Sequence, residues 1–436
     1  MEKVEPRTLS GFLELLPEEQ ILFNQLQDII RETYEKYGFL PLDTPVIEYS
    51  SVLLAKAGGE TEKQIYRFNK GDNDLSLRFD LTVPLAKYVA KNYNDLIFPF
   101  KRYQIGKVYR GERSQKGRFR EFYQCDIDII GDNELSLLND AQIPCVISEI
   151  FTKMNIGKFT IRINNRKLLN GLFQSLQVEN NTKEILREID KIDKIGEEKV
   201  KENLLDLNLS QEQVKGVLNF IKISGSINEK IQQLEMLNIK NETFLLGLEE
   251  IKTVISYMRD LGMKEENFTI DLTIARGLDY YTGTVYETIL NDYPSIGSIC
   301  SGGRFDSLAE FYTDKKLPGV GMSIGLTRLF YQLREAGIIK VEKKTLLDVL
   351  LISMTNNSNY VLNVAKQARD QDIKVDVCDL EKTTKQKFKY ANRIQVPYVG
   401  IIGEEEEQEN KISLKNMQTG EQELLTIEEF IRKIKD

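Results

Sequence analysis

Charged residues that could hold a small ligand gather around residues 103–131. Residues 101–120 are basic and contain one carboxylate, Glu112. The cations in this range are Lys101, Arg102, Lys107, Arg110, Arg113, Lys116, Arg118 and Arg120. The end of the stretch is acidic, with Asp126 and Asp128. Because cations bind phosphates and carboxylates bind amines, the stretch could hold a nucleoside triphosphate beside a substrate that carries an amino group.

The second half of this stretch alternates between polar and apolar residues. The even-numbered positions include Arg118, Arg120, Phe122, Gln124, Asp126 and Asp128. The odd-numbered positions include Phe119, Tyr123, Ile127 and Ile129. A period of two residues is typical of a β-strand with one buried face. We therefore expect a strand whose polar face forms the floor of a site. The tip at residues 113–117 is explained equally well as a plain turn.

Length and composition limit what the rest of the chain can be. The chain has 436 residues and a net charge of −8, which is long enough for about two or three domains. No apolar run approaches the roughly 20 residues that a membrane span needs, and residues 1–7 do not resemble a signal peptide. We therefore expect a cytoplasmic protein that has no contact with a membrane.

The residue types and motifs that the sequence lacks exclude several kinds of catalytic and binding site. The sequence contains no histidine and its four cysteines form no CxxC pair, which excludes imidazole bases and argues against a zinc knuckle. No GxxxxGK[ST] motif is present, so phosphates are not held by a P-loop. The acidic net charge means that a nucleic acid would have to bind local basic patches.

Hydrophobic periodicity divides the chain into two parts. Residues 17–38 predict an amphipathic helix, residues 41–50 an edge or interface segment, and residues 75–91 a short strand that runs into a helix after Thr82. Helical periodicity then dominates residues 165–262, an insertion that precedes a strand, turn and strand at residues 270–290. This pattern predicts an α/β (α+β) fold with a helical insertion.

The C-terminal third has its own pattern. Residues 318–333 predict a strand followed by a helix that begins near Gly325 and carries Arg328 in its first turn, where a cation is unfavourable unless an anion binds. From residue 345 the pattern predicts a compact α/β domain with a mixed sheet. We interpret the acidic run at residues 404–407 as a solvated loop.

Several long motifs in these segments resemble class II aminoacyl-tRNA synthetases, and in particular histidyl-tRNA synthetases. RGERSQKGRFREFYQCDIDIIG is similar to motif 2, YGFLPLDTPVIE to motif 1 and GVGMSIGLTRL to motif 3. RGLDYYTGTVYE resembles the histidine-binding motif, and LSLRFDLTVPLAKY the amino-acid-binding segment. KQKFKYANRIQVPYVGIIGEEE resembles the anticodon-binding domain. The resemblance covers nearly the whole chain and is weakest in the helical insertion.

The resemblance implies a set of ATP-binding residues. Arg110 is expected to hold the α-phosphate, and Glu112 the amino group of adenine. Phe122 and Arg328 are expected to enclose the adenine ring, a contact worth about 0.5–2 kcal/mol. Two further arginines are placed near the triphosphate, Arg118 and Arg120. Mg²⁺ is expected to accompany ATP, with ligands that the sequence does not identify.

The resemblance also implies contacts to L-histidine. The residues expected around its α-amino group are Asp80, Thr82 and Gln124. Asp128 and Tyr281 are expected to bind the imidazole nitrogens, with Tyr280 behind Tyr281 in the same segment and Asp126 behind the ligand contacts. Arg276 is expected to stabilise the charge that develops when the carboxylate attacks the α-phosphorus. Simple packing within a sheet remains the alternative for both tyrosines.

Further expectations concern partners and domains. Gln115 is expected to contact the acceptor stem of tRNA-His, and Pro45 to lie at a homodimer interface. The resemblance implies a catalytic domain at residues 1–337, with the helical insertion at about 170–262. A linker at residues 338–345 and an anticodon-binding domain at residues 346–436 would follow.

Two positions depart from the family pattern. Thr327 stands where many members have Glu before the arginine of motif 3. Asp80 follows Phe79 where many bacterial members have Pro-Glu, which shortens the carboxylate by one methylene group.

Three functions fit these observations. The first is a histidine–tRNA ligase, which uses ATP to form histidyl-adenylate and then charges tRNA-His. The second is a non-catalytic relative, such as the regulatory subunit of ATP phosphoribosyltransferase, in which we expect eroded ATP-site residues and no anticodon-binding domain. The third is a class II synthetase for another amino acid, in which Asp128 and Tyr281 would have other roles.

Overall fold

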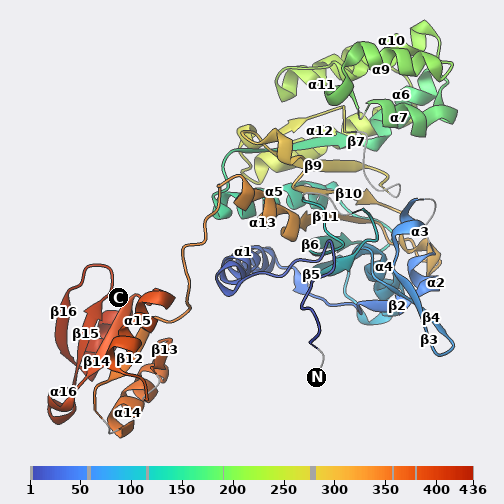
Figure 1. The fold of residues 1–436 in the computed structure, drawn as a ribbon. Coiled ribbons are helices and arrows are strands. Elements are labelled where there is room, and N and C mark those ends of the chain that lie inside the picture. Colours follow the sequence, from blue (N-terminus) through green and yellow to red (C-terminus); the bar gives the residue numbers. More distant parts are fainter. Residues whose placement is uncertain are drawn as a thin grey trace. The chain divides into compact units, whose positions relative to one another are not determined.

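The computed structural model describes residues 3–55, 60–113, 117–189, 191–274, 281–355, 358–378 and 381–435. The chain divides into two compact units, one of residues 1–14 and 27–339 and the other of residues 15–26 and 340–436. Figure 1 shows the elements of both units, coloured along the chain. No helix among the described residues is long and apolar enough to cross a membrane.

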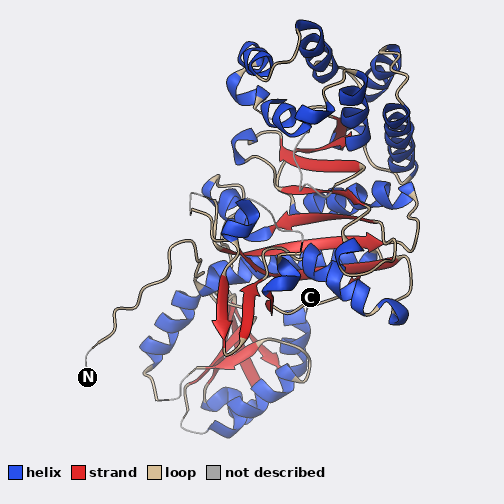
Figure 2. Ribbon diagram, turned by 90° about the vertical axis from the view of Figure 1, so that its right-hand side faces the viewer, coloured by secondary structure: helices blue, strands red, loops and turns tan. Residues whose placement is uncertain are grey.

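A large sheet organises the first unit. Its strands are β1 (Leu40–Pro41), β5 (Phe100–Tyr109), β6 (Glu121–Ile130), β7 (Phe159–Asn165), β8 (Phe268–Ile270), β9 (Thr284–Leu290), β10 (Cys300–Phe305) and β11 (Gly319–Gly325). The described residues give the order β1-β5-β6-β11-β10-β9-β7-β8 (Figure 2). Only the edge pairs β1–β5 and β7–β8 of this sheet are parallel. The expected α/β (α+β) fold with an antiparallel catalytic sheet is confirmed.

Helices cover this sheet. They include α1 (Pro17–Lys36), α5 (Leu137–Met154), α12 (Glu242–Asp260) and α13 (Leu326–Glu335). Arg304 of β10 ties α5 to the sheet, because its Nε and Nη2 donate to both carboxylate oxygens of Asp140, at 3.1 and 2.7 Å. The apolar back of β6 is buried as predicted, with Cys125, Ile127 and Ile129 fully inaccessible to solvent.

A smaller sheet precedes the central strands. It has the order β2-β4-β3 among the described residues. Its strands are β2 (Ile47–Tyr49), β3 (Arg67–Lys70) and β4 (Asn73–Leu77), and the helices beside it are α2 (Ser50–Leu53), α3 (Glu60–Gln64) and α4 (Thr82–Lys91). The predicted passage from strand to helix after Thr82 is confirmed by β4 and α4, and Pro41 lies in the edge strand β1 as expected.

The predicted insertion is helical. Its helices, green to yellow in Figure 1, are α6 (Arg166–Ser175), α7 (Thr182–Ile189), α8 (Ile192–Ile195), α9 (Glu197–Asp206), α10 (Gln211–Ile221), α11 (Ile227–Met236) and α12. One prediction at its end was wrong, because the strand expected to begin at residue 270 is β8, which ends at Ile270. The Asp271 side chain instead accepts hydrogen bonds from the backbone and hydroxyl of Thr273, which favours a turn.

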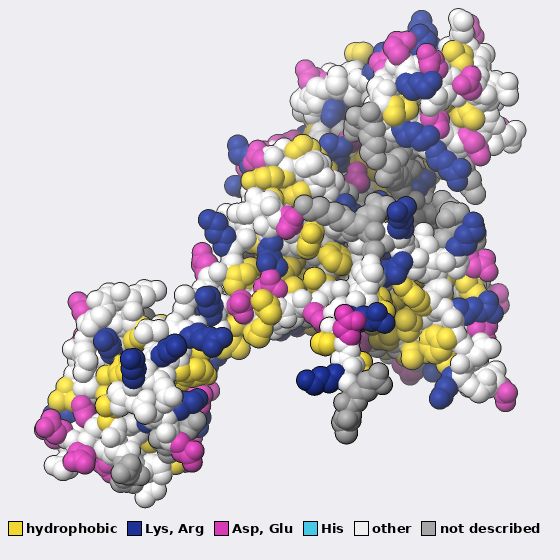
Figure 3. All heavy atoms as spheres, viewed as in Figure 1, with side chains coloured by type: hydrophobic (Ala, Val, Ile, Leu, Met, Phe, Trp, Pro, Cys, Tyr) yellow, Lys and Arg dark blue, Asp and Glu magenta, His cyan; other side chains and the backbone are white. Residues whose placement is uncertain are grey.

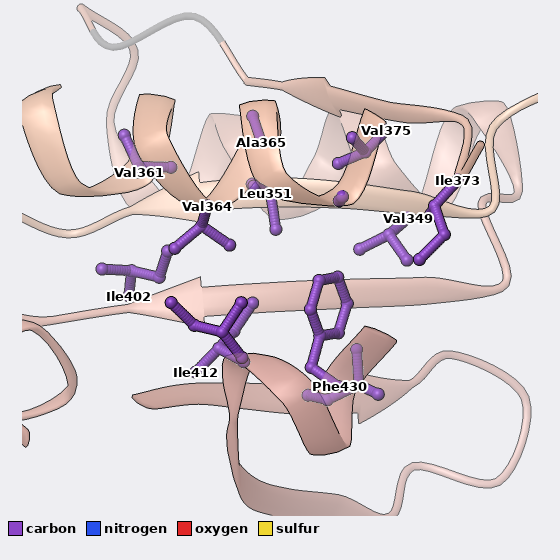
Figure 4. Packing of buried hydrophobic residues seen from close by; sticks show 13 residues of the cluster. Val349, Leu351, Val361, Val364, Ala365, Ile373, Val375, Ile402, Ile412 and Phe430 are labelled. Carbon is purple, nitrogen blue, oxygen red and sulfur yellow. The ribbon is translucent and has the colours of Figure 1, made fainter. Parts of the chain in front are cut away.

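The second unit has its own core. Its described residues form a mixed sheet in the order β13-β12-β14-β15-β16. The strands are β12 (Val349–Ser353), β13 (Val375–Val377), β14 (Tyr398–Ile402), β15 (Lys411–Asn416) and β16 (Gln422–Thr426). The helices α14 (Ser358–Arg369) and α17 (Ile427–Lys435) pack on one face around Phe430 (Figure 4). α15 (Thr384–Ile394) packs against Leu350 and Ile352, on the other face.

The interpretation of residues 404–407 as a loop was wrong. They begin a helix, α16 (Glu404–Glu409). Carboxylates in a first helical turn are favoured by the helix dipole. Glu406 also accepts a hydrogen bond from the backbone N–H of Gly403 at 2.8 Å and one from the Ser413 hydroxyl at 3.0 Å. These hydrogen bonds stabilise the helical conformation of a highly charged segment.

Candidate active site

Apart from Arg120, the predicted site residues that are described meet in one cleft of the first unit. The cleft has a volume of about 490 Å³. Its lining includes Asp80, Thr82, Arg110, Glu112, Arg118, Phe122, Gln124, Asp128, Tyr281 and Arg328. Three other predicted residues, Gln115, Arg276 and Tyr280, lie outside the described residues. The sheet thus brings together side chains that are far apart in the sequence.

Strand β6 forms the floor of the cleft. Its residues Phe122, Gln124, Asp126 and Asp128 line the cleft, as the alternating pattern predicted. The placement of Arg118 and Arg120 on the same strand was wrong, because β6 begins at Glu121. The backbone N–H of Arg120 donates instead to Gly11 O in the N-terminal segment, at 2.7 Å.

A buried arginine lies among three carboxylates at one end of this floor. Arg102 is fully buried on β5, and its Nη2 lies 2.6 Å from Asp128 Oδ2 and donates to Leu81 O at 3.2 Å. Asp80, Asp126 and Asp128 are also buried. Burial raises the pKa of all three carboxyl groups, while Arg102 lowers it. The pKa of Asp126 rises to about 7.

Asp80 is held by the helix that follows it. Its Oδ1 accepts a hydrogen bond from the backbone N–H of Val83, at 2.9 Å in the first turn of α4. This bond and the nearby Arg110 lower the pKa of Asp80, against the larger effect of burial. The carboxylate therefore has a fixed position at the wall of the cleft, beside Thr82.

Two glycines leave space next to Asp128. Gly321 of β11 pairs with Asp128 and with Gly303 of β10. A Cβ atom on Gly321 would lie 2.2 Å from Asp128 Oδ1, and one on Gly303 would lie 2.9 Å from the Tyr281 ring. The glycines thus open a slot bordered by a carboxylate and a tyrosine, which suits a flat ring with polar edges.

The other end of the cleft is rich in arginine. The guanidinium carbon of Arg110 lies 5.1 Å from the centre of the Phe122 ring. Arg118 forms an ion pair with Glu112 at 3.4 Å. Arg328 is the third residue of α13, as predicted, and its Nη2 donates to Ile296 O at 3.1 Å. Burial and nearby Arg118 lower its pKa, and Glu112 raises it. Such a cluster favours an anionic ligand.

Thr327 has a structural role that explains its departure from the family pattern. It is buried, and its hydroxyl accepts a hydrogen bond from the backbone N–H of Tyr123 at 2.8 Å. This bond joins the start of α13 to the floor strand and so fixes Arg328 relative to Phe122.

The cleft also contains polar residues that the sequence did not single out. They are Gln64, Glu287, Ser298, Ser301, Ser323 and Gln332. Strand register explains three of them, because Ser323 pairs with Asp126, Ser301 with Ser323 and Glu287 with Ser301. Of these residues, only Glu287 could have been predicted from the sequence. It lies in the same motif as Tyr281, an even number of residues away, so both would lie on the same face of a strand.

Comparison with known proteins identifies the family. A histidyl-tRNA synthetase family model matches residues 11–329, and an anticodon binding domain model matches residues 347–436. The histidine–tRNA ligase of Clostridium tetani is 56% identical over 99% of both chains. That of Finegoldia magna is 49% identical over 99% of this chain and 100% of the relative. The crystal structure of histidyl-tRNA synthetase from Nostoc sp. PCC 7120 matches with a TM-score of 0.92, at 43% identity and 99% coverage of both chains.

The chain belongs to the histidyl-tRNA synthetase family. It is therefore an aminoacyl-tRNA synthetase, with the function of a histidine–tRNA ligase, and it has both a catalytic and an anticodon-binding part. The non-catalytic alternative is less similar. A Bacillus halodurans structure described as an ATP phosphoribosyltransferase regulatory subunit/histidyl-tRNA synthetase shares the fold, with a TM-score of 0.77, at 21% identity.

Replacing Gly321 by Ala should block the slot. The added Cβ atom would lie 2.2 Å from Asp128 Oδ1 and 2.4 Å from Ile127 O, so the floor must shift. We expect kcat/KM for histidine to fall by about 100-fold or more in ATP–pyrophosphate exchange, because a displacement of about 1 Å can cost that much. Gly325→Ala on the same strand is the comparison, since a Cβ atom there meets nothing within 4 Å. Equal activities of the two variants would contradict the role of the slot.

Proposed function

We propose that the cleft activates L-histidine with ATP and that the histidyl group then passes to the 3′ end of tRNA-His. The observation that carries this proposal is the division of the cleft into two ends. Three buried carboxylates form one end, and Arg118 and Arg328 lie at the other. Arg110 lies between them, close enough to Asp80 to lower its pKa. An amino group suits the first end and a triphosphate suits the second.

The arginine end is assigned to ATP. Arg110 holds the α-phosphate, and Arg118 lies near the rest of the triphosphate. Arg120 is not part of the cleft lining. The adenine ring lies between Phe122 and Arg328, whose Nε has no hydrogen-bond partner among the described residues. Glu112 accepts the amino group of adenine. Mg²⁺ arrives with ATP as part of the substrate, and we assign no protein ligand to it.

The carboxylate end is assigned to histidine. Asp80, Thr82 and Gln124 surround the α-amino group. Gln124 supports this assignment, because its amide donates to the Ser323 hydroxyl at 2.8 Å and its Oε1 has no partner within the described part of the chain. That oxygen is oriented to accept a hydrogen bond from an ammonium group. The imidazole ring lies in the slot between Asp128 and Tyr281, and Tyr280 supports Tyr281.

These positions give a two-step reaction. The histidine carboxylate attacks the α-phosphorus, and pyrophosphate leaves as histidyl-adenylate forms. Arg110 neutralises charge on the phosphate, and we assign Arg276 to the charge that develops during the attack. The terminal ribose hydroxyl of the tRNA then attacks the acyl carbon and releases AMP.

Gln115 is assigned to the tRNA acceptor stem. Protein synthesis requires these partners in the cytoplasm, where we place the enzyme.

The second unit is assigned to the anticodon arm, and α15 is its contact surface. This helix contains Lys385, Lys387, Lys389 and Arg393 and no carboxylate, in a protein whose net charge is −8. Lys385, Lys389 and Arg393 recur every four residues, are exposed and so form one basic stripe. Figure 3 shows basic side chains gathered over α15. Exposed Tyr390 adds an aromatic ring on which a base can stack.

The domains follow these assignments. The catalytic domain comprises residues 1–337, with the helical insertion at about 170–262, and the linker comprises residues 338–345. Residues 346–436 form the anticodon-binding domain.

The catalytic unit forms a homodimer through the segment that carries Pro45. This segment exposes a run of apolar side chains: Leu40 (60% exposed), Val46 (37%), Ile47 (47%) and Tyr49 (57%). Pro41 and Pro45 are exposed in the same run. Exposed apolar side chains gathered in one segment are typical of a protein interface, and a second copy of the chain is assigned as the partner that covers them.

Replacing Asp128 by Asn tests the histidine assignment. We expect the KM for histidine to rise by about 10- to 150-fold, because a charged hydrogen bond is worth about 1.5–3 kcal/mol. The KM for ATP should stay within about twofold, since the nucleotide binds the other end of the cleft. Steady-state ATP–pyrophosphate exchange measures both. Glu134→Gln removes an exposed carboxylate outside the cleft and is the control. An unchanged KM for histidine in Asp128→Asn would remove Asp128 from the site.

Reversing two charges on α15 tests the tRNA surface. Lys385→Glu with Lys389→Glu should raise the KM for tRNA-His by about tenfold or more, because phosphate contacts dominate nucleic-acid affinity. ATP–pyrophosphate exchange should not change, since it requires no tRNA. The control pair Lys366→Glu with Lys374→Glu makes the same change in net charge at exposed positions of the same unit. Equal effects of the two pairs on tRNA charging would refute a specific role for α15.

Replacing Ile47 by Asp tests the homodimer. Sedimentation velocity should show a dimer for the parent protein and a shift toward monomer for the variant, because a charge would be buried in an apolar interface. Leu424→Asp is the matched control, since Leu424 is 51% exposed on β16 of the other unit. A monomeric parent protein would rule the dimer out.

A further inference from the structure

Asp126 is a buried cleft residue to which the assignments above give no role. It is 2% exposed, lines the cleft, and lies between Gln124 and Asp128 on the same face of β6. Its Oδ1 accepts no hydrogen bond from any described residue. A buried carboxyl oxygen without a partner is costly, so its place on the floor needs an explanation.

The charges of the floor do not balance. Among the described residues, three buried carboxylates, Asp80, Asp126 and Asp128, lie around one fully buried cation, Arg102. Arg110 is near enough to lower the pKa of Asp80, but its charge is assigned to the α-phosphate of ATP. Arg102 contacts Asp128 at 2.6 Å, and Asp80 accepts the N–H of Val83. The α-ammonium group of bound histidine adds one positive charge, so one negative charge remains. A desolvated floor favours neutralising that charge with a proton.

Asp126 is the carboxyl group that can take this proton most easily. The pKa of its carboxyl group is raised to about 7, mainly by burial and also by the charges of Asp128 and Asp80. Arg102 on β5 lowers the pKa, as does the hydroxyl of Ser323 on β11. No described cation contacts the Asp126 carboxyl group as closely as Arg102 contacts Asp128.

The other titratable groups around Asp126 stay neutral near pH 7. They are Tyr34 on α1, Cys300 on β10 and the adjacent Cys125, and burial raises the pKa of each well above its usual value. Glu287 of β9 lines the same cleft two strands beyond β11. Among the described groups that adjoin Asp126, none adds a positive charge to that of Arg102.

We propose that Asp126 is a histidine-binding residue that holds one proton in the complex, so that histidine binding takes up a proton from solvent above neutral pH. This inference rests on the proposed function, which places the α-amino group at Asp80 and Gln124 and the ring at Asp128. The proton adds to the Asp126 carboxylate, and no other bond forms or breaks.

The affinity for histidine should therefore depend on pH in one direction. Below pH 7 the free protein already holds the proton, so Asp126 adds no pH dependence to the affinity. Above pH 7 the free protein loses the proton while the complex keeps it, so the affinity falls as pH rises. One linked proton weakens binding by at most about tenfold per pH unit. The affinity for histidine stops falling at the pH at which Asp126 releases its proton in the complex.

Replacing Asp126 by Asn tests the proposal, because the amide is neutral at every pH and matches the shape of the acid. Between about pH 7 and about pH 8.5 we expect the KM for histidine to rise by about 15-fold in the parent and by less than about twofold in the variant. The titrations of histidine itself are common to both proteins and cancel. Glu149→Gln, which removes a carboxylate of α5 outside the cleft, should behave as the parent. Equal pH profiles of Asp126→Asn and the parent would overturn the proposal.

The Asp128→Asn variant separates this proposal from the assignment of the site. If its KM for histidine is unchanged at all pH values, the proposed site itself fails. If its KM rises while Asp126→Asn keeps the parent profile, only the role of Asp126 fails.

Calorimetry of the unmodified protein gives a test that does not depend on a folded variant. Histidine is titrated at about pH 8 in two buffers with different ionisation enthalpies, and the difference in heat gives the number of protons taken up. We expect uptake of nearly one proton per histidine bound, because the free Asp126 is mostly ionised at that pH. No uptake would overturn the proposal.

Discussion

The contact between Arg102 and Asp128 is the interaction on which the rest of the site depends. The two side chains face each other across the β5–β6 pair, and Arg102 is completely removed from solvent. A buried ion pair adds little to stability compared with apolar packing, but removing one partner leaves an uncompensated charge. The pair therefore fixes the position of a carboxylate that would otherwise be too costly to bury. Asp80 and Asp126 depend on the same cation, because Arg102 lowers the pKa of both.

Space and charge together select the ligand. Gly321 and Gly303 leave room over the floor beside Asp128, and Tyr281 borders the same room. The proposed ligand, an amino acid with a flat side chain and polar ring edges, would fit this slot, whereas an aliphatic side chain would offer the Asp128 carboxylate no hydrogen bond. The arginine end of the cleft excludes a second cation and favours a phosphate. The proposed function thus uses opposite charges at the two ends of one cleft, whose floor is strand β6.

The sequence predicted the floor but not what supports it. Period-two alternation was enough to place Phe122, Gln124 and Asp128 on one face, because that face depends only on local geometry. The partner of Asp128 could not be found in this way, since Arg102 meets it through a strand register that the sequence does not encode locally. The row of Ser323, Ser301 and Glu287 depends on register in the same way. The acidic helix α16 was missed for another reason, because its capping bonds outweigh the charge pattern that suggested a loop.

The central proposal for this protein is that histidine lies on the β6 floor, with its ring in the glycine slot. The most direct measurement is a crystal structure of the protein with histidine and a non-hydrolysable ATP analogue. We expect an imidazole nitrogen within hydrogen-bonding distance of the Asp128 carboxylate and the α-amino group beside Asp80 and Gln124. A histidine whose ring lies away from Asp128, or whose α-amino group points toward Arg110, would contradict it.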